Sequence, residues 1–253
     1  MSSFDAFARY YDADYGAIAD DALFYRELAR RCGGPILEPM CGSGRLLVPL
    51  AQAGYRLTGV DISARMLALA RDRLADTGQL DQVDLIEADV RDMAPAGPFA
   101  LAIVALNSFM HLTTVEDQFA ALGRIREALR PGGLLALDLL NPDLRALAGY
   151  AGELVLDKTF TLADGTRVQK FVAQHADTSA QLNQVTFIYD ELDAEGLVRR
   201  AALPFRMRWL YRYELEHLLA RAGFALESVY GSYDLDEYRG ESELMLVIAR
   251  KDE

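Results

Sequence analysis

Between about residues 36 and 141, short runs of apolar residues alternate with segments in which apolar residues recur at helical spacing. The apolar runs are candidate strands at residues 36–38, 55–60, 83–86, 99–106 and 134–140. The segments between them are candidate helices at residues 45–53, 63–74 and 115–129, with Pro131-Gly132-Gly133 expected to end the last one. Continuous apolar strands that alternate with helices are typical of a parallel sheet covered on both faces. We therefore predict an α/β fold with a doubly wound, Rossmann-like sheet.

After about residue 154 the pattern changes to long segments rich in β-branched and aromatic residues. Four such segments lie at residues 154–162, 167–175, 183–192 and 197–210, joined in pairs by turn sequences at residues 163–166 and 194–196. These are hairpin signals, so the pattern predicts an antiparallel sheet inserted into the α/β fold. A candidate helix at residues 213–222 and a strand pair at residues 226–230 and 244–249 follow, while the first 30 residues are aromatic and helical.

The composition narrows the functional classes. The chain has 253 residues, a formal net charge of −12, two cysteines and three histidines. An acidic protein is not expected to bind nucleic acid or an anionic membrane surface. Two cysteines and scattered histidines predict neither a disulfide framework nor a metal site. The sequence shows no membrane span and no signal peptide, and cysteines without a disulfide framework favour a reducing cytoplasm. We also expect a monomer or homodimer that acts on a small molecule.

The chemistry is expected in the loops after the strands, because ligands of open α/β sheets bind beyond the carboxyl ends of the strands. The loop Glu38–Arg45 contains Gly42 and Gly44, which permit either a tight turn or a close approach of the backbone to a ligand. Asp61 ends the second strand, where a carboxylate meets the two hydroxyl groups of an adenosine ribose. The pattern therefore predicts a nucleotide site.

The kind of nucleotide follows from charge. A dinucleotide fingerprint needs a third glycine, but Leu47 occupies that position, which disfavours a nicotinamide oxidoreductase. Glu38, immediately before the loop, would repel a pyrophosphate and attract a ligand that carries an ammonium and a sulfonium. S-adenosylmethionine is such a ligand. Asp89, or its close competitor Asp92, follows the third strand and would border the adenine.

Five motifs in register resemble those of the class I S-adenosylmethionine-dependent methyltransferases. They are Glu38–Gly44, Gly59–Ser63, Asp89–Asp92, Asn107–Leu112 and Leu129–Gly133. The resemblance implies a seven-stranded, mostly parallel sheet with an antiparallel last strand, and a methyl donor bound across strands one to four. A mild departure is the first loop, where glycine is commoner in the family than Pro39 or Met40. The donor-binding residues that the resemblance implies are Tyr11, Tyr15, Glu38, Met40, Cys41, Gly42, Gly44, Arg45, Asp61, Ile62, Met66, Asp89, Val90, Arg91 and Leu106.

The inserted sheet looks like that of small-molecule methyltransferases, in which it covers the acceptor side of the active site. This likeness implies an aromatic segment over the cofactor at residues 1–30 and a substrate-side lid at residues 151–210. The methyltransferase core would then comprise residues 31–150 and 211–253.

Residues that bind the acceptor or assist the reaction are less clearly marked. Asn107 and His111 follow the fourth strand, where the methyl group is expected, so they are candidates for acceptor binding and catalysis. Tyr11 is the third catalytic candidate. Each has a plainer interpretation: His111 as a wall of the pocket or a helix start, and Tyr11 as a packing residue of an amphipathic helix.

Two arginines in the insert also have two interpretations. Arg206 and Arg208 alternate with large apolar residues, Met207 and Trp209 among them, so both guanidinium groups share one face of a strand. That face is either solvated or turned into the cavity to bind an acidic acceptor. We therefore include Arg206, Arg208 and Trp209 among the candidate substrate residues.

The resemblance predicts transfer of a methyl group from S-adenosylmethionine to a nitrogen or oxygen of a small-molecule acceptor by in-line displacement. Positioning supplies much of the rate in such a reaction, and a base is needed only if the acceptor arrives protonated. This agrees with a sequence that shows no strong acid–base pair. The alternative is a regulatory protein that binds S-adenosylmethionine without turnover.

Overall fold

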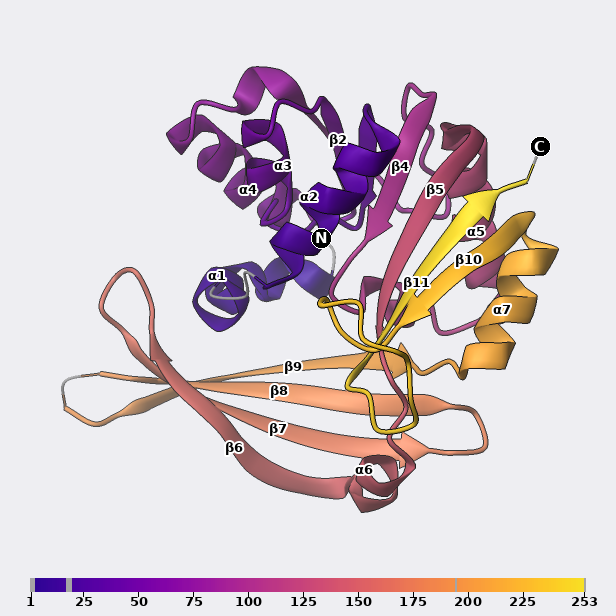
Figure 1. Ribbon diagram of the computed structural model, residues 1–253. Coiled ribbons are helices and arrows are strands. Elements are labelled where there is room, and N and C mark those ends of the chain that lie inside the picture. Colours follow the sequence, from indigo (N-terminus) through magenta and orange to yellow (C-terminus); the bar gives the residue numbers. More distant parts are fainter. Residues whose placement is uncertain (1–2, 17–19, 194, 253) are drawn as a thin grey trace.

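The computed structural model describes residues 3–16, 20–193 and 195–252, and in these residues the strands form two separate sheets (Figure 1). The larger sheet has seven strands in the order β10-β11-β5-β4-β1-β2-β3. Its strands are β1 (Ile36–Pro39), β2 (Leu57–Asp61), β3 (Val83–Glu87), β4 (Phe99–Val104), β5 (Leu129–Leu140), β10 (Phe224–Tyr230) and β11 (Leu244–Lys251). Neighbours among β1 to β5 pair in parallel, and β11 pairs antiparallel with both β5 and β10. The predicted seven-stranded, mostly parallel sheet is confirmed.

Helices cover both faces of this sheet. These helices are α2 (Asp20–Cys32), α3 (Leu47–Gln52), α4 (Ala64–Asp76), α5 (Val115–Ala128) and α7 (Arg212–Arg221), whereas α6 (Leu144–Gly149) lies beside the second sheet (Figure 1). One apolar cluster joins Ile125 of α5 and Leu218 of α7 to the sheet, and another joins Leu28, Leu50 and Leu67 of α2, α3 and α4 to it (Figure 1). Because both faces are covered, the central strands β1 and β4 are buried along their whole length.

The helix starts follow the sequence signals closely. The Ser63 hydroxyl accepts a hydrogen bond from the Met66 amide at 3.2 Å, and the Thr114 hydroxyl accepts one from the Asp117 amide at 3.1 Å. Several boundaries differ from the prediction by a few residues, and the two clearest are a helix start and a strand start. The helix predicted from residue 45 begins at Leu47, because the preceding residues form the turns of the glycine loop, and β5 already begins at Leu129.

The second sheet is an antiparallel meander of β6 (Ala151–Thr161), β7 (Arg167–Asp177), β8 (Leu182–Leu192) and β9 (Val198–Arg208). Both predicted strand pairs, β6 with β7 and β8 with β9, form antiparallel ladders. Ala194, in the turn predicted between β8 and β9, lies outside the described residues, as do residues 1–2 and 17–19 of the predicted N-terminal segment and residue 253.

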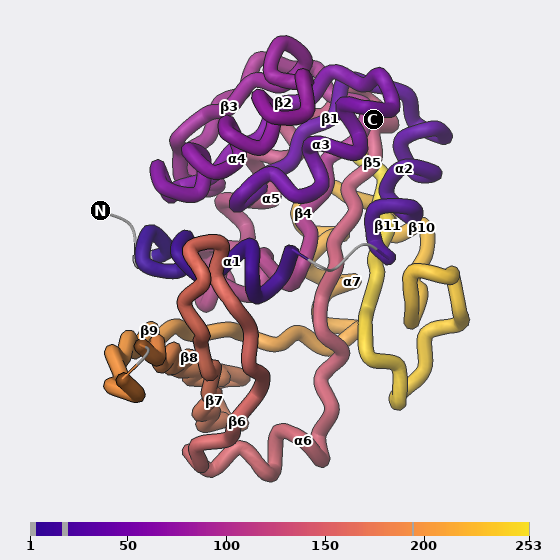
Figure 2. The backbone as a smooth tube through the Cα atoms, turned by 90° about the vertical axis from the view of Figure 1, so that its left-hand side faces the viewer, coloured from indigo at the N-terminus to yellow at the C-terminus, as the bar shows by residue number. Residues whose placement is uncertain are grey.

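The N-terminal residues lie between the two sheets. They form a 3-10 turn, η1 (Ser3–Ala6), and the helix α1 (Ala8–Tyr15). The ribbon view and the backbone tube both place α1 beside the second sheet and below the helices α3 and α4 of the larger sheet (Figures 1 and 2). The cavity described below therefore has walls from the core, from α1 and from the second sheet.

Candidate active site

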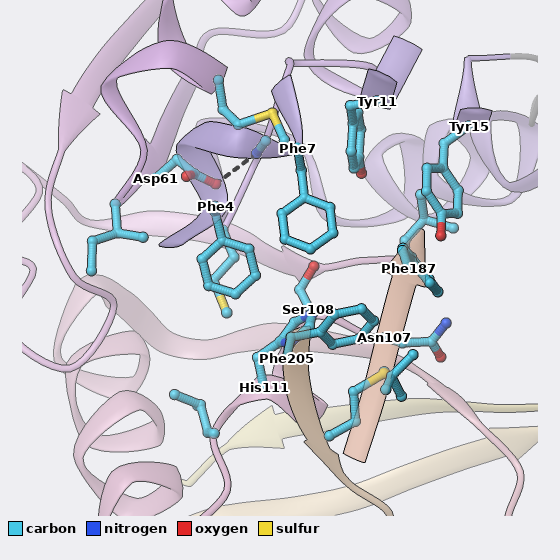
Figure 3. Close-up of a pocket in the computed structure, with 18 of the residues that line it drawn as sticks. Phe4, Phe7, Tyr11, Tyr15, Asp61, Asn107, Ser108, His111, Phe187 and Phe205 are labelled. Atoms are coloured by element: carbon cyan, nitrogen blue, oxygen red, sulfur yellow. Dashed lines mark hydrogen bonds between the residues drawn. The ribbon is translucent and has the colours of Figure 1, made fainter. Parts of the chain in front are cut away.

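A cavity of about 560 Å³ lies at the carboxyl ends of β1, β2, β3 and β4. Its far side is formed by α1, β7, β8 and β9, so both sheets contribute to it (Figure 3). Thirteen of the residues predicted for the site line it: Tyr11, Tyr15, Met40, Gly42, Asp61, Ile62, Met66, Asp89, Val90, Arg91, Leu106, Asn107 and His111. The strand-end loops thus meet as the parallel sheet requires.

Asp61 is held at the end of β2 by two backbone amides. One carboxylate oxygen accepts a hydrogen bond from the Gly42 amide and the other accepts one from the Ser63 amide, both at 2.8 Å. Burial raises the pKa of Asp61 above its ordinary value, while these amides oppose the rise. Because a carboxylate has about four acceptor positions, two remain for the hydroxyl groups of a ligand.

The turn after β4 has an uncommon backbone. Leu106 and Asn107 are both left-handed, with φ of 48° and 62°, and both line the cavity. Asp138 of β5 holds them: its carboxylate accepts the Leu106 amide at 3.1 Å and its backbone carbonyl accepts the Asn107 amide at 3.0 Å. Tyr233 donates its hydroxyl proton to the same carboxylate at 2.5 Å. Sequence reasoning missed Asp138, whose one signal is an acid inside an otherwise apolar strand.

The side-chain oxygen of Asn107 is buried and lacks a hydrogen-bond partner among the described residues. A buried acceptor without a donor is costly, so its place in the cavity wall points to a donor group on a ligand. An ammonium or a hydroxyl would satisfy it. Together, Asn107 and Asp61 provide hydrogen-bond acceptors for a ligand that carries both an amine and a ribose.

Comparisons with known proteins identify the family. Residues 36–133 match the family model of a methyltransferase domain. The cypemycin N-terminal methyltransferase of a Streptomyces species is 28% identical over 219 residues, which are 87% of this chain and 84% of that protein. The chain belongs to the class I S-adenosylmethionine-dependent methyltransferases. Its relatives are named as enzymes, so the alternative of a regulatory protein without turnover finds no support.

Solved structures show the same fold as this methyltransferase over its whole length. The CcbJ methyltransferase of Streptomyces caelestis superposes with a TM-score of 0.82 at 24% identity, covering 100% of this chain and 99% of that one. CalS10, an amino pentose methyltransferase of Micromonospora echinaspora solved with S-adenosylmethionine bound, gives a TM-score of 0.69 at 21% identity, with 93% of each chain covered. No helix in the described part of the methyltransferase is long and apolar enough to cross a membrane.

Four residues predicted to bind the donor lie behind the cavity wall of the methyltransferase, because the glycine loop folds down onto the core. Gly44, with φ of 72°, lets the loop pack on α4: a Cβ there would stand 2.9 Å from the Cβ of Ala70. Cys41 is buried against β2. Arg45 forms a bidentate ion pair with Asp21 of α2 instead of facing the ligand.

Glu38 is the fourth of these residues. It is 4% exposed, and burial raises its pKa to about 8, although Arg45 opposes the rise. One of its carboxylate oxygens has no hydrogen-bond partner among the residues that the structure describes. Glu38 is therefore a buried acid beneath the loop, without a contact to the cavity.

Asp89 lines the cavity, but its carboxylate is already hydrogen-bonded to Arg91. It accepts hydrogen bonds from the amide and Nε of Arg91, both at 2.9 Å, and Arg91 also donates to Asp117 of α5 at 2.8 Å. Arg91 lowers the pKa of Asp89. Asp117 lines the cavity as well, although its sequence context indicates only the acidic first turn of a helix.

His111 ends the short 3-10 turn η3 (Ser108–His111) in an aromatic environment. Its ring meets Phe4 edge-on at a centroid distance of 5.0 Å and is tilted against Phe205 at 5.5 Å (Figure 3). Burial lowers the pKa of His111 to about 4, so the imidazole is neutral at physiological pH. The contacts are those of a pocket wall.

The wall of the cavity opposite the strand ends comes from the alternating side chains of the second sheet, which sequence reasoning did not single out. Its apolar members are Val172, Val185, Phe187, Phe205 and Met207, and its polar members are Lys170, Gln174 and, on β6, Asp157. The signal was present in the strand period, because residues two apart share a face. Only the packing shows which face is turned inward.

The same alternation corrects the prediction for the arginines. Since Phe205 and Met207 point into the cavity, Arg206 points out and is exposed. Arg208 pairs with Glu214 of α7 at 3.4 Å. Trp209 is 3% exposed in the main apolar core. None of the three lines the cavity, so they provide no acid-binding wall.

Proposed function

We propose that this methyltransferase methylates the amine nitrogen of a small-molecule acceptor that lacks an acidic group. The observation that carries the proposal is the charge of the cavity wall. Its cations, Arg91 and Lys170, are each already paired with two carboxylates of the protein: Arg91 with Asp89 and Asp117, and Lys170 with Asp157 and, beneath the wall, Asp14. An acidic acceptor would therefore meet no unpaired cation among the described lining residues.

The apolar part of the wall favours the same class. Phe7, Phe187 and Phe205 form a cluster of edge-to-face rings at centroid distances of 4.8 to 6.2 Å. Aromatic faces attract cations and pack against carbon skeletons, and the net charge of −12 attracts cationic molecules to the protein. The names of two similar proteins, an N-terminal methyltransferase and an amino pentose methyltransferase, add support.

We assign the lining residues to a nucleotide half at the strand ends, which would bind the donor, and to an acceptor wall formed by the second sheet. Asp61 would accept from the ribose hydroxyl groups, and the left-handed turn at Leu106 and Asn107 would receive the methionine end. Ile62, Met66 and Val90 provide apolar contacts for the base. When bound, S-adenosylmethionine would supply a methyl group carried on a positively charged sulfur. The nitrogen lone pair would bond to the methyl carbon as the carbon–sulfur bond breaks and S-adenosylhomocysteine leaves.

Positioning is the main contribution of the protein to such a reaction. Holding two reactants in line can lower the barrier by roughly 7–11 kcal/mol, and the apolar wall excludes water from the reacting atoms. The nucleophile is the nitrogen lone pair, so an amine attracted to the protein as an ammonium must release its proton to water before methyl transfer. A neutral His111 at the wall leaves the cavity without an added positive charge that would oppose the positively charged donor.

The test is a matched panel of acceptors. Apolar primary and secondary amines would be incubated with the protein and S-adenosylmethionine, each beside an analogue that also carries a carboxylate, and release of S-adenosylhomocysteine would be measured. We expect the amines without a carboxylate to be methylated, and their carboxylated analogues to release S-adenosylhomocysteine at least tenfold more slowly. Equal or preferred turnover of the carboxylated compounds, or of alcohols, would refute the proposed acceptor class.

We also infer a cytoplasmic protein that acts as a monomer or homodimer without nucleic acid. The two cysteines, Cys32 and Cys41, are free thiols in the structure. Free thiols and a strongly acidic surface support this inference. Sedimentation of the purified protein with and without a short DNA duplex would test the oligomeric state and the expected lack of nucleic-acid binding.

A further inference from the structure

The helix α1 presents different faces to its neighbours. Tyr11 and Tyr15, one helical turn apart, line the cavity (Figure 3). Tyr10 and Asp14, also one turn apart, face the second sheet, where Tyr10 stacks on Tyr189 at a centroid distance of 4.0 Å. The position of the two cavity tyrosines is therefore decided by what holds the other faces of the helix.

Asp14 is a buried contact of α1 with the second sheet. Its side chain has no exposed surface. One carboxylate oxygen lies 2.9 Å from Nζ of Lys170 and accepts the Tyr189 hydroxyl at 2.9 Å, and the other lies 2.5 Å from Nζ of Lys158. Three groups on β6, β7 and β8 thus converge on one carboxylate of α1.

Lys170 connects this carboxylate to the acceptor wall. Its side chain is only 4% exposed, and Nζ lies 3.1 Å from Asp157 and 3.9 Å above the ring of Phe187. A buried ammonium that loses a carboxylate partner carries a large desolvation penalty. Displacing α1 would impose that penalty, so the buried pair favours one discrete position of the helix.

The opposite side of α1 is tied to the core. Asp12 accepts the Ser43 hydroxyl of the glycine loop at 2.7 Å and pairs with Arg73 of α4 at 2.7 Å. A Cβ on Gly42 would stand 3.7 Å from the Tyr11 hydroxyl, so Tyr11 lies directly over that loop. A donor in the nucleotide half is therefore covered by a helix whose outer side is held by Asp14.

We propose that Asp14 is a positioning residue that locks α1 over the donor site through Lys170. The proposal rests on the proposed function, because it assigns the donor to the half of the cavity beneath Tyr11. With the pair intact, Tyr11 and Tyr15 stay closed over the ligand, and the ligand leaves only when the contact between α1 and the second sheet opens. The pair therefore controls the dissociation rate of the donor more than its association rate.

The experiment measures S-adenosylhomocysteine binding to the immobilised full chain by surface plasmon resonance, which needs no acceptor. We expect Asp14→Asn to raise the dissociation rate about tenfold while the association rate stays within about threefold, the usual signature of truncating a buried charge pair. Lys170→Met should act in the same way. The double variant should be no worse than either single variant, because both residues act through one contact.

Two controls separate positioning from a merely structural role. Asp164→Asn removes an exposed partner of Arg9, which also links α1 to the second sheet, and should leave both rates unchanged. Ile125→Val lowers stability in the core beneath α5, far from α1, and should not change the dissociation rate.

A dissociation rate within twofold of wild type in Asp14→Asn would overturn the proposal. So would single effects that multiply in the double variant, since the residues would then act independently. If the wild-type protein fails to bind S-adenosylhomocysteine at all, the proposed function itself is wrong, which is a different outcome from a variant that binds with unchanged kinetics.

Discussion

Replacing Asp61 with alanine should separate the two tasks of this carboxylate. In the structure its oxygens already accept the Gly42 and Ser63 amides at 2.8 Å, which leaves about two acceptor positions for the ribose hydroxyl groups. Two charge-assisted hydrogen bonds in a half-buried site are worth roughly 2–4 kcal/mol together, so donor affinity should fall about 30- to 1000-fold. The same change leaves two amides without an acceptor, which should lower the free energy of unfolding by about 1–3 kcal/mol.

Calorimetric titration with S-adenosylhomocysteine measures the first effect, and urea unfolding of the unliganded protein measures the second. Glu87→Gln is the matched control, because Glu87 pairs in register with Asp61 on the next strand, is exposed and does not line the cavity. It should change affinity by less than about threefold. Unchanged affinity in Asp61→Ala, with the expected loss of stability, would show that Asp61 only supports the loop and would refute its role in donor binding.

Three further predictions test other parts of the site. Ligand at 100 times its dissociation constant adds about 2.7 kcal/mol, so S-adenosylmethionine should raise the melting temperature by roughly 5–10 °C, whereas an equal shift with NAD would contradict the assignment. The pKa of Glu38 is raised from 4.5 to about 8, so the unliganded protein loses stability as pH rises through that range. Glu38→Gln removes this loss and should be more stable than wild type at pH 9 by up to about 5 kcal/mol in thermal unfolding, whereas identical pH profiles would argue against a buried proton. Once an acceptor is in hand, Phe205→Ala should raise its KM at least fivefold and Arg206→Ala should leave it unchanged, and the reverse pattern would mean that the wrong face of β9 has been placed in the cavity.

Local signals were sufficient for most of the core. Each strand of the parallel sheet is a short apolar run, and the caps Ser63 and Thr114 mark the helix starts, because these preferences act over a few residues. Local sequence signals failed where the start of a strand depends on its pairing with a neighbouring strand. Residues 131–133 have a helix-ending composition, yet they lie within β5, whose first residue, Leu129, pairs with Phe99 of β4.

The site residues divide in the same way. Asp61 and Asn107 were predictable because both follow strands of a parallel sheet, and the ends of such strands must meet. Glu38 and Arg45 were predicted to contact the ligand because they flank the glycine loop in the sequence. The loop instead turns both side chains toward the core. Arg45 pairs there with Asp21 of α2, and the sequence pattern does not show that α2 lies beside the loop.

The sequence by itself determined the fold class, the family with its cofactor, and the edge of the sheet at which the predicted site residues meet, because periodicity, glycine loops and strand-end acids are local properties. Tertiary structure decided which side chains of the second sheet line the cavity. Whether Phe205 or Arg206 faces the cavity depends on which side of the second sheet packs toward the core, and both choices satisfy the strand period equally well. It also brought together Asp14 and Lys170, which lie 156 residues apart in the chain and pair only because α1 docks on that sheet. Contacts between distant segments depend on the burial of whole surfaces, and no short stretch of sequence records them.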